Sequence, residues 1–159
     1  MRKFSLPQIS FYFLRLWRLP LTMARSSRQL GSAWEAQFTA DALKRGLHVL
    51  HPFGDYLPYD LVVQNPKKKN IRVQVKGTQS QMKGKPNTYR ITASCGNSTM
   101  GRTRMSKEQT DVLAIYVEPC NLWYHIPVEK VNAMAVNLCT NESSTAQYEI
   151  WREAWNTYF

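Results

Sequence analysis

Three polar side chains have types and spacings suited to chemistry on phosphate groups. Asp60 lies at the start of an apolar run, residues 59–63, and Gln74 and Lys76 lie two positions apart in a second apolar run, residues 71–76. The stretch between the runs is polar and rich in turn formers, which predicts an antiparallel β-hairpin. Side chains alternate along a strand, so Gln74 and Lys76 share one face, which Asp60 can reach.

Such a group suits the hydrolysis of a phosphodiester, which uses a divalent cation held by oxygen ligands and a positive charge near phosphorus. Asp60 supplies an anionic ligand, and the Gln74 amide and the Val75 main-chain carbonyl supply neutral ones. Lys76 can orient the attacking water or stabilise the charge on phosphorus. One carboxylate is little charge for a dication, so a second acid is expected, and Glu35 on a preceding helix is the candidate.

The order of these residues resembles the PD-(D/E)XK nuclease superfamily, and within it the group I intron homing endonuclease branch. Glu35 matches the acid on the first helix, Asp60 the metal-binding acid, and Gln74 with Lys76 the Gln-x-Lys ending of that branch. The resemblance covers roughly residues 23–131. Two positions depart from the superfamily pattern: Gln74 replaces an acid, and Tyr59 replaces the proline before the metal-binding acid.

The resemblance implies a mixed α/β (α+β) fold, with a restriction-endonuclease-like core of four to five strands flanked by helices. It implies Mg²⁺-dependent cleavage of double-stranded DNA by a homo-oligomer, a dimer or a tetramer. The implied metal ligands are Glu35, Asp60, Gln74 and Val75, and the implied catalytic residues are Glu35, Asp60, Gln74 and Lys76.

Other readings of the same residues stay open. An acid and a lysine on adjacent strands also form ordinary exposed ion pairs, worth less than about 1 kcal/mol. Within the nucleases, a structure-selective Holliday-junction resolvase shares the fold. Outside them, the chain could be a catalytically silent DNA-binding module, or an accessory protein whose charge is incidental. Asp55, in the loop before the hairpin, is a rival metal ligand.

The charge of the chain agrees with a polyanionic partner. The formal net charge is +10 over 159 residues, and excess positive charge on a small domain favours nucleic acid. Two basic loops, residues 78–86 and 94–107, are expected to contact phosphates. Their candidate DNA-binding residues are Lys83, Lys85, Arg102, Arg104 and Lys107.

The cysteines and the hydropathy restrict the cellular location that the sequence predicts. The three cysteines, Cys95, Cys120 and Cys139, contain no C-x-x-C pair, which excludes a zinc ribbon or finger. Their odd number favours free thiols in a reducing compartment, so a cytoplasmic location is expected. No apolar run is long enough to span a bilayer, and no membrane partner is expected.

The chain divides into a basic, aromatic N-terminal extension, residues 1–22, and a nuclease-like domain, residues 23–159. The extension is expected to be dispensable, and Met23 is a plausible alternative start. Ser26 or Ser27 can cap a helix that runs to about Gly46. Strands are expected at 47–50, 59–63, 71–76, 89–93, 111–117 and 122–126, helices at 127–135 and 150–158, and loops at 94–110 and 137–146.

Overall fold

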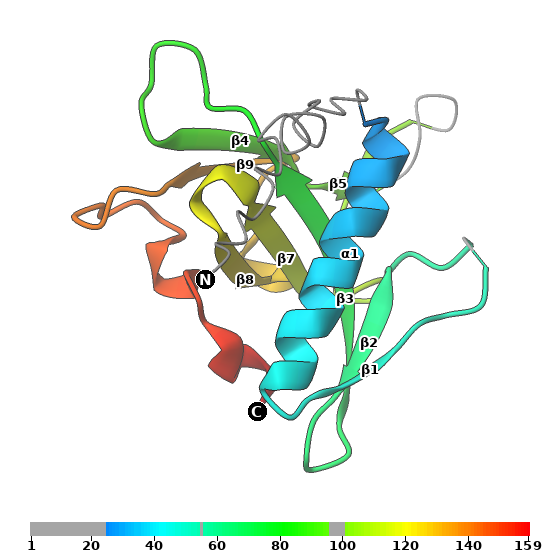
Figure 1. Ribbon diagram of the computed structural model, residues 1–159. Helices are drawn as coiled ribbons and strands as arrows, with labels where there is room; N and C mark the ends of the chain where they lie inside the picture. Colours follow the sequence, from blue (N-terminus) through cyan, green and yellow to red (C-terminus); the bar gives the residue numbers. More distant parts are fainter. Residues whose placement is uncertain (1–24, 55, 96–100) are drawn as a thin grey trace, which may run out of the picture.

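The computed structural model describes residues 25–54, 56–95 and 101–159. A single long helix, α1, lies across one face of a five-stranded sheet with the order β1-β2-β3-β7-β8 (Figure 1). The parts of this layer are α1 (Ser27–Lys44), β1 (His48–Leu50), β2 (Leu61–Gln64), β3 (Asn70–Thr78), β7 (Val112–Val117) and β8 (Leu122–Pro127). No helix in the described ranges is long and apolar enough to cross a membrane.

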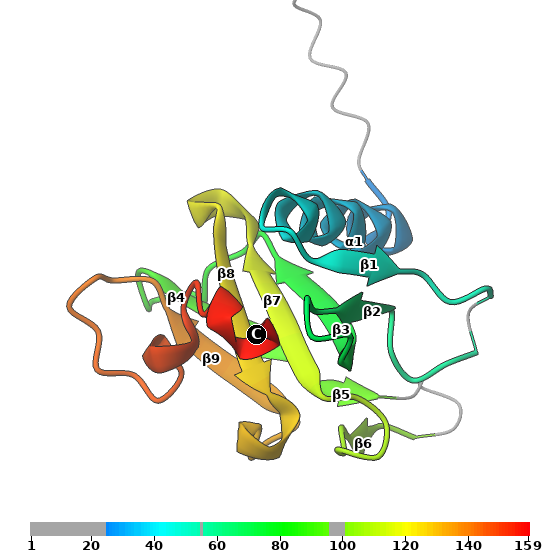
Figure 2. The same cartoon turned by 90° about the horizontal axis from the view of Figure 1, so that it is seen from below.

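The sheet is mixed, as the sequence predicts. Neighbouring strands are antiparallel except for β3 and β7, which run parallel. β4 (Thr88–Thr92) pairs with β9 (Ala135–Cys139) in a second, two-stranded sheet, and β5 (Ser94–Cys95) pairs with β6 (Thr103–Arg104) in a third. Figure 2 shows α1 covering β1, β2 and β3 on one side, with β4 and β9 on the other side of the molecule. The predicted α+β class is confirmed.

Local sequence signals define both ends of α1. The Ser26 hydroxyl accepts a hydrogen bond from the Gln29 main-chain N–H (3.2 Å), and the Gln29 side chain accepts one from the Ser26 N–H (2.9 Å). This reciprocal pair satisfies two main-chain donors that the first turn leaves open. After the last helical residue, Lys44, the chain turns at Gly46 with φ of +77°, a left-handed conformation that glycine adopts without strain.

The sheet separates two apolar cores because side chains alternate along each strand. Val73 and Val75 of β3 lie in the core that contains Phe38 of α1. Leu113 and Ile115 of β7 lie in the opposite core. Val73 and Val75 therefore face α1, and the residues between and after them, Gln74 and Lys76, project from the other face of β3.

An indole ring fixes how close α1 comes to the sheet. A Cβ added at Gly77 of β3 would lie 2.5 Å from Cε2 and Cε3 of Trp34, so the ring rests directly on the glycine. The Trp34 indole N–H donates to one oxygen of Glu118 (2.8 Å), and Arg25 donates to the other (3.0 Å). Glu118 follows the last residue of β7, so this contact also ties the helix to the strand next to β3. The same contact determines the position of Glu35, the next residue of α1.

The C-terminal third departs from the sequence prediction. The helix expected at 127–135 is a single 3-10 turn, Val128–Lys130, and β9 occupies the start of the expected loop at 137–146. The expected C-terminal helix consists of two 3-10 turns, Glu149–Trp151 and Trp155–Tyr158. Trp155 and Tyr158 are buried against Phe38, so the spacing of apolar residues there reflects burial of an irregular segment. β5 and β6 lie within the expected loop at 94–110.

Candidate active site

Asp60 lies where β2 and β3 separate. Its main-chain N–H donates to the Val73 carbonyl (3.0 Å), one residue before β2 begins. Its Oδ2 accepts a hydrogen bond from the Val75 main-chain N–H (2.7 Å) and another from the Gln74 side-chain amide. The carboxylate thus takes the place of a strand partner for β3. The predicted approach of Asp60 to Gln74 across the hairpin is confirmed.

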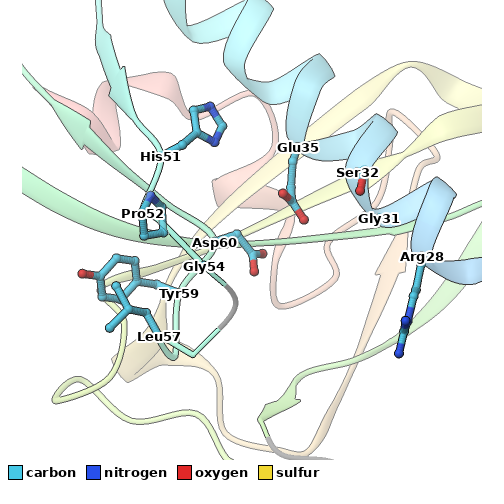
Figure 3. Close-up of a pocket in the computed structure, with 10 residues that line it drawn as sticks. All are labelled: Arg28, Gly31, Ser32, Glu35, His51, Pro52, Gly54, Leu57, Tyr59 and Asp60. Carbon is cyan, nitrogen blue, oxygen red and sulfur yellow. The ribbon is translucent and has the colours of Figure 1, made fainter.

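Glu35 and Asp60 line one cavity of about 500 Å³. The cavity lies between α1 and the segment that connects β1 to β2, and both carboxylates project into it (Figure 3). Its wall also includes Arg28, Gly31, Ser32, His51, Pro52, Gly54, Leu57 and Tyr59. Residues distant in sequence, on a helix and at a strand end, therefore present two acids to the same space, as the sequence predicts.

Gln74 reaches Asp60 from the side of the sheet away from α1, and Lys76 lies on the same face of β3. Gln74 is buried and Lys76 is partly exposed. The thiol of Cys95 in β5 lies close enough to respond to both Lys76 and Asp60: burial raises the pKa of this thiol, the Lys76 ammonium opposes the rise, and the Asp60 carboxylate adds to it. Asp60 thus joins the cavity with Glu35 to the Gln74 and Lys76 side of the sheet.

The candidate DNA-binding residues do not gather at this cavity, and none of the five lines it. Lys83 and Lys85 lie on the loop between β3 and β4, across the molecule from the β1–β2 segment (Figures 1 and 2). The Arg104 guanidinium donates to the Val131 carbonyl (2.9 Å). Lys107 forms an ion pair with Glu129 (3.1 Å). Arg102 is exposed beside β6. Their role in DNA binding stays a prediction.

Two polar residues of the cavity, Arg28 and His51, are not among the site residues predicted from the sequence. Arg28 precedes Glu35 by seven positions, which is two helical turns, so helical spacing alone could have placed it on the same face. His51 is held by Thr39: its Nε2 lies 3.1 Å from the Thr39 hydroxyl, which itself donates to the Glu35 carbonyl (2.9 Å). The hydroxyl has one proton, so His51 is the donor in that contact. No sequence signal indicates this pairing.

The available donors suit a hard cation. Asp55, the rival ligand, and residues 1–22 lie outside the described residues. Within the described ranges no group of three or more His, Cys, Asp or Glu side chains could hold a metal. The donors are therefore the carboxylates of Glu35 and Asp60, with amide and main-chain oxygens beside them. Mg²⁺ fits such a set, because it keeps several of its waters and takes one or two carboxylates from the protein.

The sequence as a whole matches one family model. A model of PD-(D/E)XK endonucleases matches residues 25–158, which include the helix, the sheet and every residue of the site. The chain belongs to the PD-(D/E)XK endonuclease family. The resemblance noted from Glu35, Asp60, Gln74 and Lys76 is thereby confirmed, and with it the assignment to the nucleases.

Two solved structures of nucleases are similar to this PD-(D/E)XK endonuclease. The bacterial homing endonuclease I-Ssp6803I has a TM-score of 0.73 and 26% sequence identity, covering 84% of this chain and 93% of its own. Hjc, a Holliday junction resolvase from the archaeal hyperthermophile Archaeoglobus fulgidus, has a TM-score of 0.44 and 14% identity, covering 70% and 84%. No curated protein sequence matches significantly. The similarity to I-Ssp6803I covers more than four fifths of the chain.

Proposed function

We propose that this PD-(D/E)XK endonuclease hydrolyses phosphodiester bonds of double-stranded DNA with Mg²⁺, as a homing-type enzyme similar to I-Ssp6803I. The observation that carries the proposal is the position of Asp60. Its carboxylate shares a cavity with Glu35 and accepts hydrogen bonds from Gln74 and Val75. A nuclease family member with two acids in one cavity, beside an amide and a lysine, has the groups that phosphodiester hydrolysis uses.

In this proposal Glu35 and Asp60 hold the cation. The main-chain N–H and C=O of a strand residue point to the same edge. The Val75 N–H points to Asp60, so its carbonyl faces the same edge, where β2 no longer pairs with β3. This carbonyl is the proposed neutral ligand. When bound, Mg²⁺ supplies positive charge at the phosphate and lowers the pKa of a coordinated water.

The Gln74 amide has two orientations with different consequences. Its nitrogen donates to Asp60 in this structure, which directs its oxygen away from that carboxylate. Rotation by half a turn about the terminal bond exchanges the two atoms at almost no steric cost. The oxygen then faces the same space as the Asp60 carboxylate, and the amide acts as a ligand. We expect this orientation in the metal-bound protein.

Lys76 is proposed to orient the attacking water or to stabilise the charge that develops on phosphorus. It lies on the same face of β3 as Gln74, and its charge acts on the Cys95 thiol together with that of Asp60. An ammonium at this place adds positive charge where an anion develops, which is the usual basis of such catalysis. A homo-oligomer in solution is proposed as well, and sedimentation measures it directly.

The experiment is cleavage of supercoiled plasmid and of a four-way junction, with Mg²⁺ and with EDTA. We expect nicking of the plasmid only with Mg²⁺ and its loss in Asp60→Asn, which keeps the shape of the side chain. Glu142→Gln removes an exposed acid in the loop after β9 and is the matched control. Parental cleavage by Asp60→Asn would refute the proposed site. A strong preference for the four-way junction over linear duplex would show that the enzyme is a Holliday-junction resolvase and not a homing-type endonuclease.

A further inference from the structure

The cavity that holds Glu35 and Asp60 has two walls of opposite chemistry. In Figure 3 the Arg28 side chain extends from α1 on one side, while Pro52, Leu57 and Tyr59 lie on the other. The two carboxylates are between them. Neither wall has a role in the catalytic arrangement described above.

Arg28 is uncommitted among the described residues. Most arginines there are engaged: side chains of Arg25, Arg45, Arg72, Arg104 and Arg152 all bond to protein oxygens. Arg28 has no such contact in the described ranges, is exposed, and lies on the helix face of Ser32 and Glu35. A guanidinium matches the geometry of phosphate oxygens. An exposed guanidinium on the cavity wall with no protein partner among the described residues is available to a phosphate group.

The opposite wall continues into an exposed aromatic rim. Phe53 is 93% exposed and Tyr56 is 76% exposed, and Leu57 beside them is also exposed. Gly54 has φ of +88°, and a Cβ added to it would collide with the Tyr56 ring, so the ring rests on this turn. Phe53 and Tyr56 do not line the cavity themselves, but they are next in the chain to Pro52, Gly54 and Leu57, which do. Large exposed apolar side chains on such a segment indicate a contact surface. Aromatic side chains stack on nucleobases or wedge between them once the base stack opens.

The cavity and the exposed aromatic residues beside it, Phe53 and Tyr56, are together called the trough. We propose that the trough binds one DNA strand across Glu35 and Asp60, with a backbone phosphate on Arg28 and an unstacked base against Phe53 and Tyr56. The inference rests on the proposed nuclease function and specifies its substrate: a duplex opened or kinked next to the cut. The net charge of +10 favours the nucleic acid as the occupant. A protein partner on the aromatic rim is the competing outcome.

The cationic wall is tested by the salt dependence of duplex binding in EDTA, where nothing is cut. Arg28→Ala should reduce the slope of log K against log salt by about one. Arg90→Ala is the matched control: Arg90 is exposed on β4, in the second sheet. Its slope should equal that of the parent. An equal reduction of the slope in the two variants would show only an effect of general charge, and an unchanged slope in Arg28→Ala would exclude a phosphate contact. Either result overturns the proposed role of Arg28.

The aromatic wall is tested with two duplexes of one sequence, intact and with mismatched central pairs. A mismatch lowers the cost of unstacking, so the parent should bind the mismatched duplex more tightly, by about tenfold if one base stacks. Phe53→Ala/Tyr56→Ala should bring the ratio close to one, whereas Phe159→Ala, which removes a half-exposed ring at the C-terminus, should keep it. No preference in the parent overturns the proposal, as does dissociation of an oligomer in Phe53→Ala/Tyr56→Ala with an unchanged ratio.

These measurements separate the inference from the proposed function. Binding in EDTA is measured without cleavage, and the test of the nuclease assignment uses neither the Arg28 nor the aromatic variants, so each claim can fail without the other. If Asp60→Asn abolishes cleavage while the Arg28 and aromatic variants bind like the parent, the nuclease assignment stands and the trough is wrong. If the parent never cleaves but the trough variants lose binding as described, the chain is a DNA-binding module that uses the same trough.

Discussion

Replacing Gly77 by alanine should move α1 away from the sheet and disable catalysis. The new Cβ would lie 2.5 Å from two carbons of the Trp34 ring, whereas carbon atoms in contact are about 3.5–4.0 Å apart. The ring and the glycine must therefore separate by at least about 1 Å. The backbone of Gly77 is an ordinary β3 conformation, so the added methyl group acts through this contact alone.

The ring cannot retreat freely, because its indole N–H is bonded to Glu118. Overpacking of this kind costs about 1–3 kcal/mol of the free energy of unfolding. The helix carries Glu35 directly after Trp34, so a shift of about 1 Å also displaces a proposed metal ligand, and an error of that size costs about a hundredfold in rate.

The assay pairs urea unfolding with single-turnover plasmid cleavage. Gly31→Ala is the control for the unfolding measurement alone, because a Cβ at Gly31 meets nothing within 4 Å but Gly31 lines the cavity. That substitution should stabilise α1 by about 0.5–1 kcal/mol. In the background of Trp34→Ala, which removes the ring, Gly77→Ala should cost almost nothing further. Equal costs of Gly77→Ala with and without the ring would refute the steric argument.

Three other predictions follow from the site and its supports. Asp111→Asn should lower the free energy of unfolding by about 1–2 kcal/mol at pH 7. Hydrogen bonds from Arg72 hold the pKa of Asp111 below its usual range, so the stabilisation is complete above about pH 3.9 and falls as the pH drops through the lower folded-state pKa. Urea unfolding at pH 7 and pH 3 measures this. Gln74→Glu should tighten Mg²⁺ binding in calorimetry yet lower the metal-free melting temperature, since it sets a second carboxylate beside Asp60; unchanged affinity would place Gln74 outside the ligands. A chain that begins at Met23 should fold and cleave like the full chain, and loss of the cooperative melt would contradict this.

The sheet was predictable where strands are short apolar runs bounded by turn formers. The β2–β3 hairpin and the β7–β8 pair follow this pattern and were confirmed. β9 was missed although Val136 and Leu138 alternate with other residues as in a half-buried strand. The polar residues that follow, rich in Asn, Ser and Thr, are typical of a loop and outweighed this short signal. Its partner β4 lies far away in sequence, and a pairing of that range leaves no local signal.

The site was predictable to the extent that strand alternation determines it. The period of two places Gln74 and Lys76 on one face, and the hairpin register brings Asp60 to them. The repeat of side-chain direction along a strand or helix does not predict how closely α1 packs on the sheet. That distance depends on Gly77 accepting the Trp34 ring, a contact between residues of different elements. The walls of the cavity depend on it too, since Arg28 belongs to α1 and Tyr59 to the segment before β2.

Asp60 explains why the active groups can come from both faces of one sheet. Side chains on β3 that face α1 are buried apolar residues, so the polar Gln74 and Lys76 have to project from the other face. A carboxylate at the edge of β3, just before the first residue of β2, reaches both sides: its Oδ2 is bonded to β3 and the same group lines the cavity with Glu35. Moving Asp60 by one residue into β2 would reverse the direction of its side chain and break this link. The separation of β2 from β3 at this point is therefore what assembles the proposed site, and the residue that ends their pairing also serves as the proposed metal ligand.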